Sequence, residues 1–392
     1  MKKMMNRSFY CGPFGITAWS LSQLKRVNVP ASSWFSGNNV FYAYRARTAI
    51  AYLPELLEIK VGDEVLMPAY NCGSEIDSFL KLGISVVFFR IDASGRIDVE
   101  DIKHKLSGKT KAVYVTHYFG FPQDLTDLQA LCKQRGLFLI EDCALSLFSS
   151  DNNRKLGYLG DVAVASFPKT LPLPDGGALI VNNQALWSKT WALKQPPVFL
   201  VYRRLLPLIK ASVLRYLSRK PCYHSIFYWL SDLLEAGKTG GHSNLAEKWK
   251  VMPEGYYYKS ALDNRRMSFL SKRMLDRIDY TQVVEKRRTN YQRLLSMFSD
   301  NPNVMPMFRA LPPGVCPLVF PVIVQDRENI NIELNKQHIH AIPWWAGYHR
   351  DLSWNGFEEA RFLKDHVLAL PIHQDLTEDE VDFIGNRFLA AI

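Results

Sequence analysis

The residues best suited to chemistry lie in the stretch SFPKTLPLPDGG at 166–177. Lys169 follows the apolar run VAVAS and has apolar or proline neighbours. A lysine buried in such surroundings has a lowered pKa, and its neutral amine can condense with an aldehyde. Ser166 offers a hydroxyl that can hold a phosphate, and Gly176 and Gly177 allow a tight backbone before the next apolar run. The alternative is a surface loop with a solvated lysine.

Asp142 is a second candidate, because it directly follows four apolar residues in LFLIEDCA. An acid at this position can simply cap the next helix. In the functional interpretation, its negative charge favours the protonated form of a heterocyclic nitrogen. Tyr70 and His117 also close or follow apolar runs, and both a structural and a catalytic role stay open for His117.

The elements that would position these residues alternate along residues 40–185. The apolar runs DEVLMPA, ISVVFFRI, KAVYVTHY and LFLIEDC are predicted strands, and the segments between them have helical spacing. Apolar strands that are separated by helices indicate a mostly parallel sheet covered on both faces. Ligands of such sheets lie at the carboxyl ends of the strands, which is where the candidate residues fall.

The rest of the chain predicts a second, smaller unit. Helical spacing returns from residue 267, and it is followed by the strand PLVFPVIVQ, the loop IPWWAGYHR, the strand HVLALPI and the helix LTEDEVDFIGNRFLAAI. We therefore expect a large α/β domain over 1–260 and a small α+β domain over 261–392. A basic, aromatic insert at about 186–258 interrupts the alternation.

The charge of the chain is concentrated in this insert. The formal net charge is +10, and between Gly176 and Ser231 eight Lys or Arg residues occur without a single Asp or Glu. Residues 200–235 combine an apolar helical face with these charges and with aromatic residues. This pattern predicts either a solvated helical hairpin that packs on a dimer or a peripheral contact with a membrane surface. Zinc-finger and RNA-binding signatures are missing, so we expect no nucleic-acid partner.

Cysteine usage and hydropathy indicate the compartment. The six cysteines are scattered without a CxxC pair, which argues against a metal site and a disulfide framework and suits a reducing environment. The sequence offers no apolar run near the roughly 20 residues of a membrane span. We expect a cytoplasmic protein, peripheral at the inner face of the membrane if the insert binds lipid.

Several motifs in order carry a resemblance to one family. They are EDCA with Asp142, GD at 160–161, the pair Ser166 and Lys169, DGG at 175–177, NRRMS at 264–268 and HVLALPIHQDLTEDEVDFI. Together with VGDEVLMPAYNCGSEIDSFLKLGISVVFF and VTHYFGFPQDL, they resemble the DegT/DnrJ/EryC1/StrS sugar aminotransferases over roughly 40–185 and 260–392. The resemblance implies an aspartate-aminotransferase-like α/β fold (the type I fold of pyridoxal-phosphate enzymes) and pyridoxal 5'-phosphate as cofactor.

The resemblance also implies a role for each matching residue. Lys169 would bond the cofactor and move a proton, and Asp142 would pair with the pyridine nitrogen and make the ring an electron sink. Ser166 would bind the cofactor phosphate. Further phosphate contacts would come from the helix start at Ala46, Arg47 and Thr48, and from Asn264 of a neighbouring subunit. The active unit would then be a homodimer with shared active sites.

Four departures from the family pattern bear on activity. Leu145 stands where the family has Gln or His, and Cys72 stands at the ring-stacking aromatic position. The gap from Ser166 to Lys169 is two residues shorter than usual, and IPWW replaces the usual substrate-binding Arg and His. The implied reaction is amination of a nucleotide- or lipid-linked keto sugar by an amino-acid donor, in surface polysaccharide biosynthesis. A non-catalytic scaffold or regulator of the same fold is the alternative. A dehydratase is less favoured, because those relatives replace the lysine with histidine.

Overall fold

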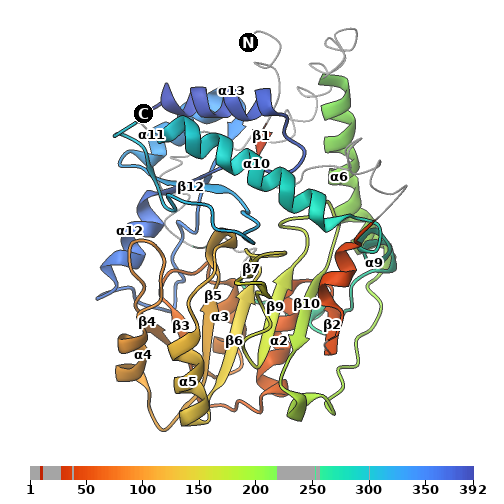
Figure 1. The fold of residues 1–392 in the computed structure, drawn as a ribbon. Helices are drawn as coiled ribbons and strands as arrows, with labels where there is room; N and C mark the ends of the chain where they lie inside the picture. Colours follow the sequence, from red (N-terminus) through yellow and green to blue (C-terminus); the bar gives the residue numbers. More distant parts are fainter. Residues whose placement is uncertain (1–8, 12–27, 38, 219–251, 253–256, 300) are drawn as a thin grey trace.

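The computed structural model describes residues 9–11, 28–37, 39–218, 252, 257–299 and 301–392 (Figure 1). Its centre is a seven-stranded sheet in the order β2-β10-β9-β6-β5-β3-β4. The strands are β2 (Asn39–Ala43), β3 (Glu64–Pro68), β4 (Ser85–Phe89), β5 (Thr110–Thr116), β6 (Phe138–Cys143), β9 (Val162–Ser166) and β10 (Gly177–Val181). This is the predicted mostly parallel sheet, in which only β10 runs antiparallel to its two neighbours.

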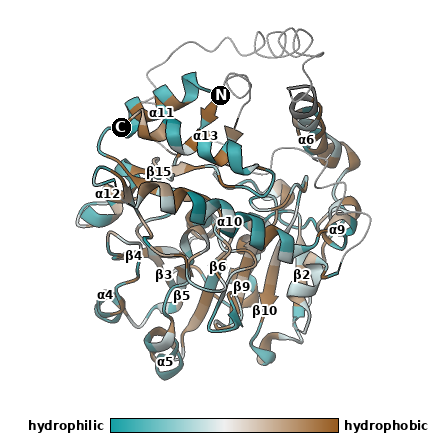
Figure 2. Cartoon of the chain, turned by 45° about the horizontal axis from the view of Figure 1, so that its top comes forward, coloured by the Kyte–Doolittle hydropathy of each residue, from teal (hydrophilic) through white to brown (hydrophobic). Residues whose placement is uncertain are grey.

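Apolar composition explains why these strands form the core. All residues of β9 and β10 are buried, as are five of the six residues of β6. Strands covered on both faces need no polar alternation, and this is the pattern that their sequences show. In Figure 2 the strands of the large sheet are mostly brown, whereas the outer helices mix teal and brown.

The helices that accompany the large sheet occur where the sequence has amphipathic spacing. They are α2 (Ala46–Leu56), α3 (Ser74–Leu80), α4 (Val99–Lys105) and α5 (Thr126–Arg135). The start of α4 is capped by Asp98, whose side chain accepts a hydrogen bond from the amide of Asp101. Gly136 ends α5 with a φ of 63°, a conformation that glycine adopts without a steric penalty.

A second sheet of four antiparallel strands follows later in the chain, in the order β11-β12-β15-β14. Its strands are β11 (Met305–Pro306), β12 (Phe320–Ile323), β14 (Ile342–Pro343) and β15 (Val367–Leu370). Its helices are α10 (Tyr280–Phe298), α11 (Arg327–Lys336), α12 (Glu358–His366) and α13 (Glu378–Leu389). Thr377 and Glu380 form a capping box at the start of α13, which fixes the boundary of this last helix. Two short pairs, β1 (Phe9–Tyr10) with β13 (Ile339–His340) and β7 (Ser150–Asp151) with β8 (Arg154–Lys155), complete the sheets of the described residues.

Where the sequence has helical spacing from residue 267, the structure has two separate helices. They are α9 (Phe269–Leu275) and α10. Each has its own N-cap, because Ser268 accepts from the amide of Ser271 and Asp279 accepts from the amide of Thr281. The strand expected over PLVFPVIVQ is likewise shorter and is limited to β12.

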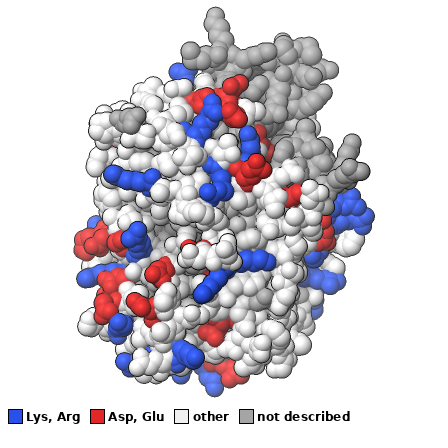
Figure 3. Space-filling view, in the orientation of Figure 1, with Lys and Arg blue, Asp and Glu red and all other residues white. Residues whose placement is uncertain are grey.

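The insert begins with α6 (Val198–Ser218), a helix that contains Pro207. In Figure 1 it rises on the side of the molecule where β2 and α9 lie. Within the described residues, no helix is both long and apolar enough to cross a membrane. The following predicted segment YHSIFYWLSDLL lies outside the described residues. On the face drawn in Figure 3, basic and acidic side chains are intermixed.

Candidate active site

Lys169 lies in the turn that follows β9, at the carboxyl edge of the large sheet. The amide of Thr170 donates to the carbonyl of Phe167 at 3.0 Å, and the amide of Phe167 donates to the carbonyl of Gly176 at 3.3 Å. The side chain of Phe167 is fully buried, so it anchors the turn to the core. The lysine side chain itself is half-buried.

Asp142 lies near the end of β6, and its carboxylate is buried. One oxygen accepts from the hydroxyl of Tyr114 at 2.9 Å, and the other accepts from the amide of Ala144 at 2.8 Å. Burial raises the pKa of Asp142, the positive charge of Lys169 opposes this shift, and the negative charge of Glu75 adds to it. The structure therefore brings the two predicted catalytic residues into electrostatic contact, with a second carboxylate nearby.

Ser166 and the start of α2 meet across the edge of the sheet. Ser166 pairs with Gly177, and Gly177 pairs with Ala43 on the next strand. A β-carbon on Gly177 would lie 2.5 Å from the amide nitrogen of Ala46, which is closer than such contacts occur. Glycine thus lets β10 pack directly against the start of α2, which brings the strand that carries Ser166 near the first amides of a helix, where an anion is stabilised by the helix dipole.

Thr48 fits the predicted phosphate contact less well than Ala46 and Arg47 do. Its amide already donates to the carbonyl of Arg45 at 3.1 Å, and its hydroxyl donates to the carbonyl of Leu262 at 3.2 Å. The Thr48 side chain is buried. Its hydroxyl therefore joins the start of α2 to the segment before Asn264, while its amide is used within the helix start.

Cys72 is tied to Glu75, a residue that the sequence analysis did not select. The backbone amide of Cys72 donates to one carboxylate oxygen of Glu75 at 3.0 Å, and its thiol donates to the other at 2.7 Å. Burial, reinforced by the charge of Glu75, raises the pKa of the Cys72 thiol to about 12, and Lys169 opposes the shift. The thiol therefore stays protonated, and Glu75 is a buried acid at the edge of the site.

The aromatic residues near this edge are packed against one another. The ring of Tyr70 contacts Tyr118 and Trp345, and its hydroxyl donates to the carbonyl of Trp344 at 3.3 Å. Trp344 in turn packs on Phe119. The IPWW segment thus packs at the junction between the two sheets. The ring and the hydroxyl of Tyr70 are both used in contacts there.

Leu145 and Asn264 behave differently from the other predicted positions. Leu145 is 1% exposed and belongs to the main apolar core, so it offers no polar contact. Asn264 is exposed, and its backbone carbonyl accepts from the amide of Lys194 at 2.7 Å. The Asn264 side chain is thus available at the surface for a neighbouring subunit.

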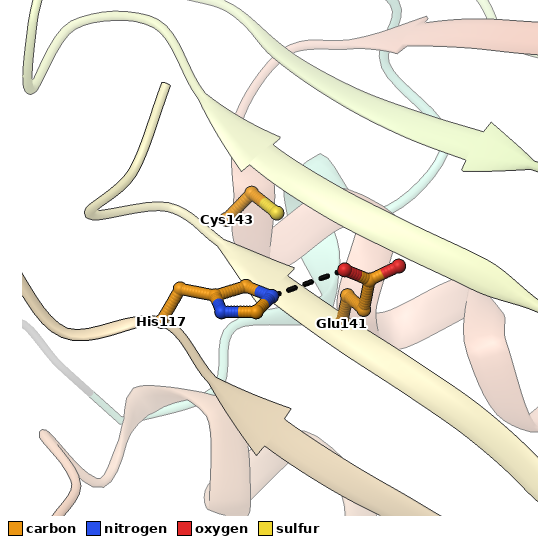
Figure 4. Close-up of side chains that lie close together, drawn as sticks. All are labelled: His117, Glu141 and Cys143. Atoms are coloured by element: carbon orange, nitrogen blue, oxygen red, sulfur yellow. Dashed lines mark hydrogen bonds and ion pairs between the residues drawn. The ribbon is translucent and has the colours of Figure 1, made fainter. Parts of the chain in front are cut away.

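His117 forms a buried cluster with Glu141 and Cys143 behind Asp142 (Figure 4). The amide of Gln123 donates to Nδ1 of His117, so the ring proton is on Nε2, which donates to Glu141 at 3.0 Å. Glu141 also accepts from three backbone amides, at Gly157, Leu159 and Gly160. Burial works to raise the pKa of Glu141, but these hydrogen bonds hold it below its usual value. With these donors and acceptors already committed, the cluster stabilises the strand that carries Asp142.

Arg287 and Gln374 support the lysine turn from the other side. Arg287 is fully buried, its Nη2 donates to the carbonyl of Thr170 at 3.2 Å, and its Nε donates to Gln374 at 2.8 Å. Gln374 donates to the same Thr170 carbonyl at 3.0 Å. The sequence analysis missed both residues, since an arginine in an amphipathic helix carries no signal that distinguishes burial from exposure.

This fold is the one found in aminotransferases of known structure. The structure is similar over 98% of the chain to PseC of Helicobacter pylori, an aminotransferase involved in the biosynthesis of pseudoaminic acid, with 99% of that chain covered. The TM-score is 0.69 at 18% sequence identity, which establishes the fold.

Residues 46–198 match the model of the DegT/DnrJ/EryC1/StrS aminotransferase family. The chain is 36% identical over 145 residues to GDP-perosamine synthase of Vibrio cholerae, a match that covers 36% of this chain and 40% of that protein. It is 32% identical over 179 residues to GDP-perosamine synthase of Escherichia coli O157:H7, with 44% and 49% covered. The chain thus spans half or less of the length of these relatives. Over these residues the chain is similar to this family of sugar aminotransferases.

The residues present fit pyridoxal phosphate. Ser166 pairs with Gly177, which packs against the start of α2, and a serine hydroxyl beside helix amides supplies the kind of donors that suit a phosphate. The buried carboxylate of Asp142 has a raised pKa, and a protonated ring nitrogen is the kind of partner that stabilises its ionised form. Lys169 supplies an amine on the same edge.

Proposed function

We propose that the protein is a pyridoxal-phosphate-dependent aminotransferase that converts a keto sugar, linked to a nucleotide or a lipid, to an amino sugar for polysaccharide biosynthesis. The observation that carries this proposal is the buried Asp142 near the end of β6, close enough to Lys169 for their charges to interact, on the sheet edge where Ser166 ends β9. Similarity to the family over residues 46–198 supports the reaction class.

Each residue has a distinct task in this proposal. When bound, pyridoxal phosphate supplies an aldehyde that takes up the amino group and a ring that stabilises negative charge. Ser166 and the amides of Ala46 and Arg47 hold its phosphate. Asp142 would keep a proton on the ring nitrogen through its charge, while Lys169 would hold the cofactor and move a proton through its Nζ.

The lysine assignment is tested by chemical trapping. Protein loaded with pyridoxal phosphate should absorb visible light, and borohydride should fix the cofactor on the peptide that contains Lys169. We expect Lys169→Ala to abolish trapping, whereas Lys103→Ala, which removes a lysine paired only with Glu100 on α4, should leave it unchanged. Trapping that persists in Lys169→Ala would show that another lysine holds the cofactor.

The scaffold alternative is favoured by one observation, the apolar and buried Leu145 where the family has a polar partner. The two functions predict different responses to glutamate, the amino donor that the family implies. An aminotransferase loses its visible absorbance when glutamate is added and regains it with a keto acid. A protein that traps the cofactor but does not respond to any amino acid fits the scaffold function.

We also propose a homodimer with shared active sites, supported by the exposed Asn264 at the surface. Within each chain we place the division between the large and the small domain near residue 260. This division separates the seven-stranded sheet from the four-stranded one.

The helix α6 supports a peripheral membrane contact within the cytoplasm. The exposed apolar residues of α6 are Val198, Phe199, Tyr202, Leu206, Ile209 and Val213. From Phe199 onward they recur every three or four positions, so they form one stripe along the helix. The exposed Arg203 and Lys210 flank this stripe, and such a surface suits an anionic lipid headgroup layer.

Vesicle flotation tests this contact with the full chain. We expect the wild type to float with phosphatidylglycerol vesicles and a variant with Val198, Tyr202, Leu206 and Ile209 changed to Ser to lose most of this binding. Val61→Ser removes an equally exposed apolar residue outside α6 and is the matched control. Equal flotation of all three proteins would refute the proposal.

A further inference from the structure

Glu75 is a buried acid in the first turn of α3, and it is 3% exposed. Its carboxylate accepts from the amide and the thiol of Cys72 at 3.0 and 2.7 Å, and from the hydroxyl of Ser74 at 3.4 Å. Within the part of the chain that the structure describes, no lysine or arginine forms an ion pair with it. A buried carboxylate without a cation in contact is costly, so a positive charge that enters this region is stabilised.

The face of α3 that carries Glu75 packs toward the candidate active site. Residues four positions apart share one face of a helix, so Glu75 lies on the same face as Phe79. The ring of Phe79 packs edge-on against Tyr114 of β5, with 6.4 Å between the ring centroids. The hydroxyl of Tyr114 in turn donates to Asp142 at 2.9 Å. This face of α3 is therefore the one that packs toward β5 and Asp142.

The charge of Glu75 acts on groups from several parts of the fold. They are Cys72 after β3, Tyr114 on β5, Tyr118 after β5, Asp142 on β6 and Lys364 on α12. The positive charge of Lys169 acts on two of the same groups, the thiol of Cys72 and the carboxylate of Asp142. Glu75 and Lys169 therefore have two neighbours in common, and charges in such a buried region interact more strongly than they do in water.

Two buried carboxylates thus lie near Lys169, and the proposed function uses only Asp142, for the ring nitrogen of the cofactor. We propose that Glu75 is a positioning residue that keeps a proton on the nitrogen of Lys169 while this nitrogen holds the cofactor. The proposal rests on the proposed function, because Lys169 holds the cofactor only there. A negative charge favours the protonated form of a neighbouring nitrogen, and the consequence is activity that persists to higher pH.

A pH titration of the visible absorbance tests this role on the full-length protein loaded with pyridoxal phosphate. The midpoint of the absorbance change marks the pH at which the nitrogen of Lys169 loses its proton. We expect Glu75→Gln to lower this midpoint by about one pH unit, because one negative charge is lost. The glutamine can still accept from the Cys72 amide and donate to the Cys72 sulfur, so the variant keeps the contacts of this turn.

Two further variants separate the charge of Glu75 from its packing. Asp77→Asn is the matched control, since Asp77 is an equally buried acid on α3 that pairs instead with His349 at 3.0 Å. It should keep the midpoint of the wild type. Glu75→Asp retains the charge and should recover most of the shift. A midpoint that falls equally in Glu75→Gln and Glu75→Asp would assign the effect to packing and would overturn the proposal.

Alkylation of Cys72 measures the charge of Glu75 in the full chain before the cofactor is added. Burial, reinforced by the charge of Glu75, raises the pKa of the Cys72 thiol to about 12. We expect iodoacetamide at pH 9 to modify Cys72 about tenfold faster in Glu75→Gln, because the thiolate fraction rises, and at the wild-type rate in Asp77→Asn. Mass spectrometry of the peptide that contains Cys72 gives the rate. Equal rates in all three proteins would show that Glu75 carries no charge and would overturn the proposal.

The absorbance titration distinguishes a failure of this role from a failure of the proposed function. A wild type that gains no visible absorbance with pyridoxal phosphate contradicts the proposed function and, with it, the role of Glu75. Normal absorbance with the same midpoint in the wild type and in Glu75→Gln overturns the role of Glu75 alone. A lower midpoint in Glu75→Gln, together with the wild-type midpoint in Asp77→Asn, supports both.

Discussion

At the residue scale, β6 places two neighbouring acids in opposite roles. Side chains alternate across a strand, so Asp142 faces Lys169 while Glu141 faces His117. Glu141 receives four hydrogen bonds and has no capacity to spare. Asp142 receives hydrogen bonds from Tyr114 and Ala144. The charge of Glu141 therefore stabilises the fold, whereas that of Asp142 has the catalytic role that we propose.

We predict that Glu141→Gln is destabilising by about 2–4 kcal/mol, because the new amide group would point at backbone donors that need an acceptor. Asp142→Asn is the matched control, an equally buried acid changed to its amide. Its cost should stay within about 1 kcal/mol, since the hydroxyl of Tyr114 can turn and accept from the asparagine. Urea unfolding followed by tryptophan fluorescence measures both. Similar stability losses in the two variants would show that the acids are not divided in this way.

At the element scale, the position of a residue could be predicted from the sequence where that position depends on a single strand. Asp142, Ser166 and Lys169 each follow an apolar run, so their common edge could be predicted from the parallel sheet alone. Lys364 could not, because it acts through contacts between distant parts of the chain. Its Nζ bonds the carbonyl of Asn71, 293 positions away. Arg287, Glu75 and the split between α9 and α10 were missed for the same kind of reason: caps and tertiary partners, not periodicity, determine them.

The loops after β3 and β14 are joined by the buried ammonium of Lys364 on α12. It donates to the carbonyls of Asn71 at 2.7 Å, Gly347 at 3.0 Å and Trp345 at 3.1 Å. Burial lowers the pKa of Lys364 from 10.5 to about 8, against the opposing charges of Glu75, Cys72 and Asp365. The unfolded chain therefore binds more protons than the folded one between these two pH values, and this group makes the free energy of unfolding rise with pH there.

We predict that the stability of the wild type relative to Lys364→Met rises by about 2 kcal/mol between pH 8 and pH 10, because the variant lacks the proton that the wild type must release. Below about pH 7, where Lys364 is protonated in both states, the difference should be constant. Lys336→Met, which removes an exposed lysine paired with Glu333, should show no such rise. Urea unfolding at several pH values measures the three proteins. A pH-independent difference for Lys364→Met would mean that the buried amine does not titrate in this range.

At the scale of the whole molecule, the central question is whether one chain contains a complete site. We place Lys169, Asp142 and Ser166 in the site of one chain, whereas Asn264 is exposed and is proposed to act in the site of a partner. If a partner chain completes the site, mixing two inactive variants gives a result that a site within one chain cannot give. Two variants that are each defective can repair each other when their chains mix, provided that their defects lie on different sides of the interface.

We predict this repair for Lys169→Ala and Asn264→Ala. Alone, the first should trap no cofactor with borohydride, and the second should retain it weakly. In a hybrid dimer, one site combines the intact Lys169 of one chain with the intact Asn264 of the other. Random mixing of equal amounts should restore about a quarter of the wild-type sites. Mixing Lys169→Ala with Ser166→Ala is the control that distinguishes the interface, because both defects then lie on the same side. If Asn264 acted within its own chain, every site in either mixture would carry one of the two substitutions. Neither mixture would then restore an intact site.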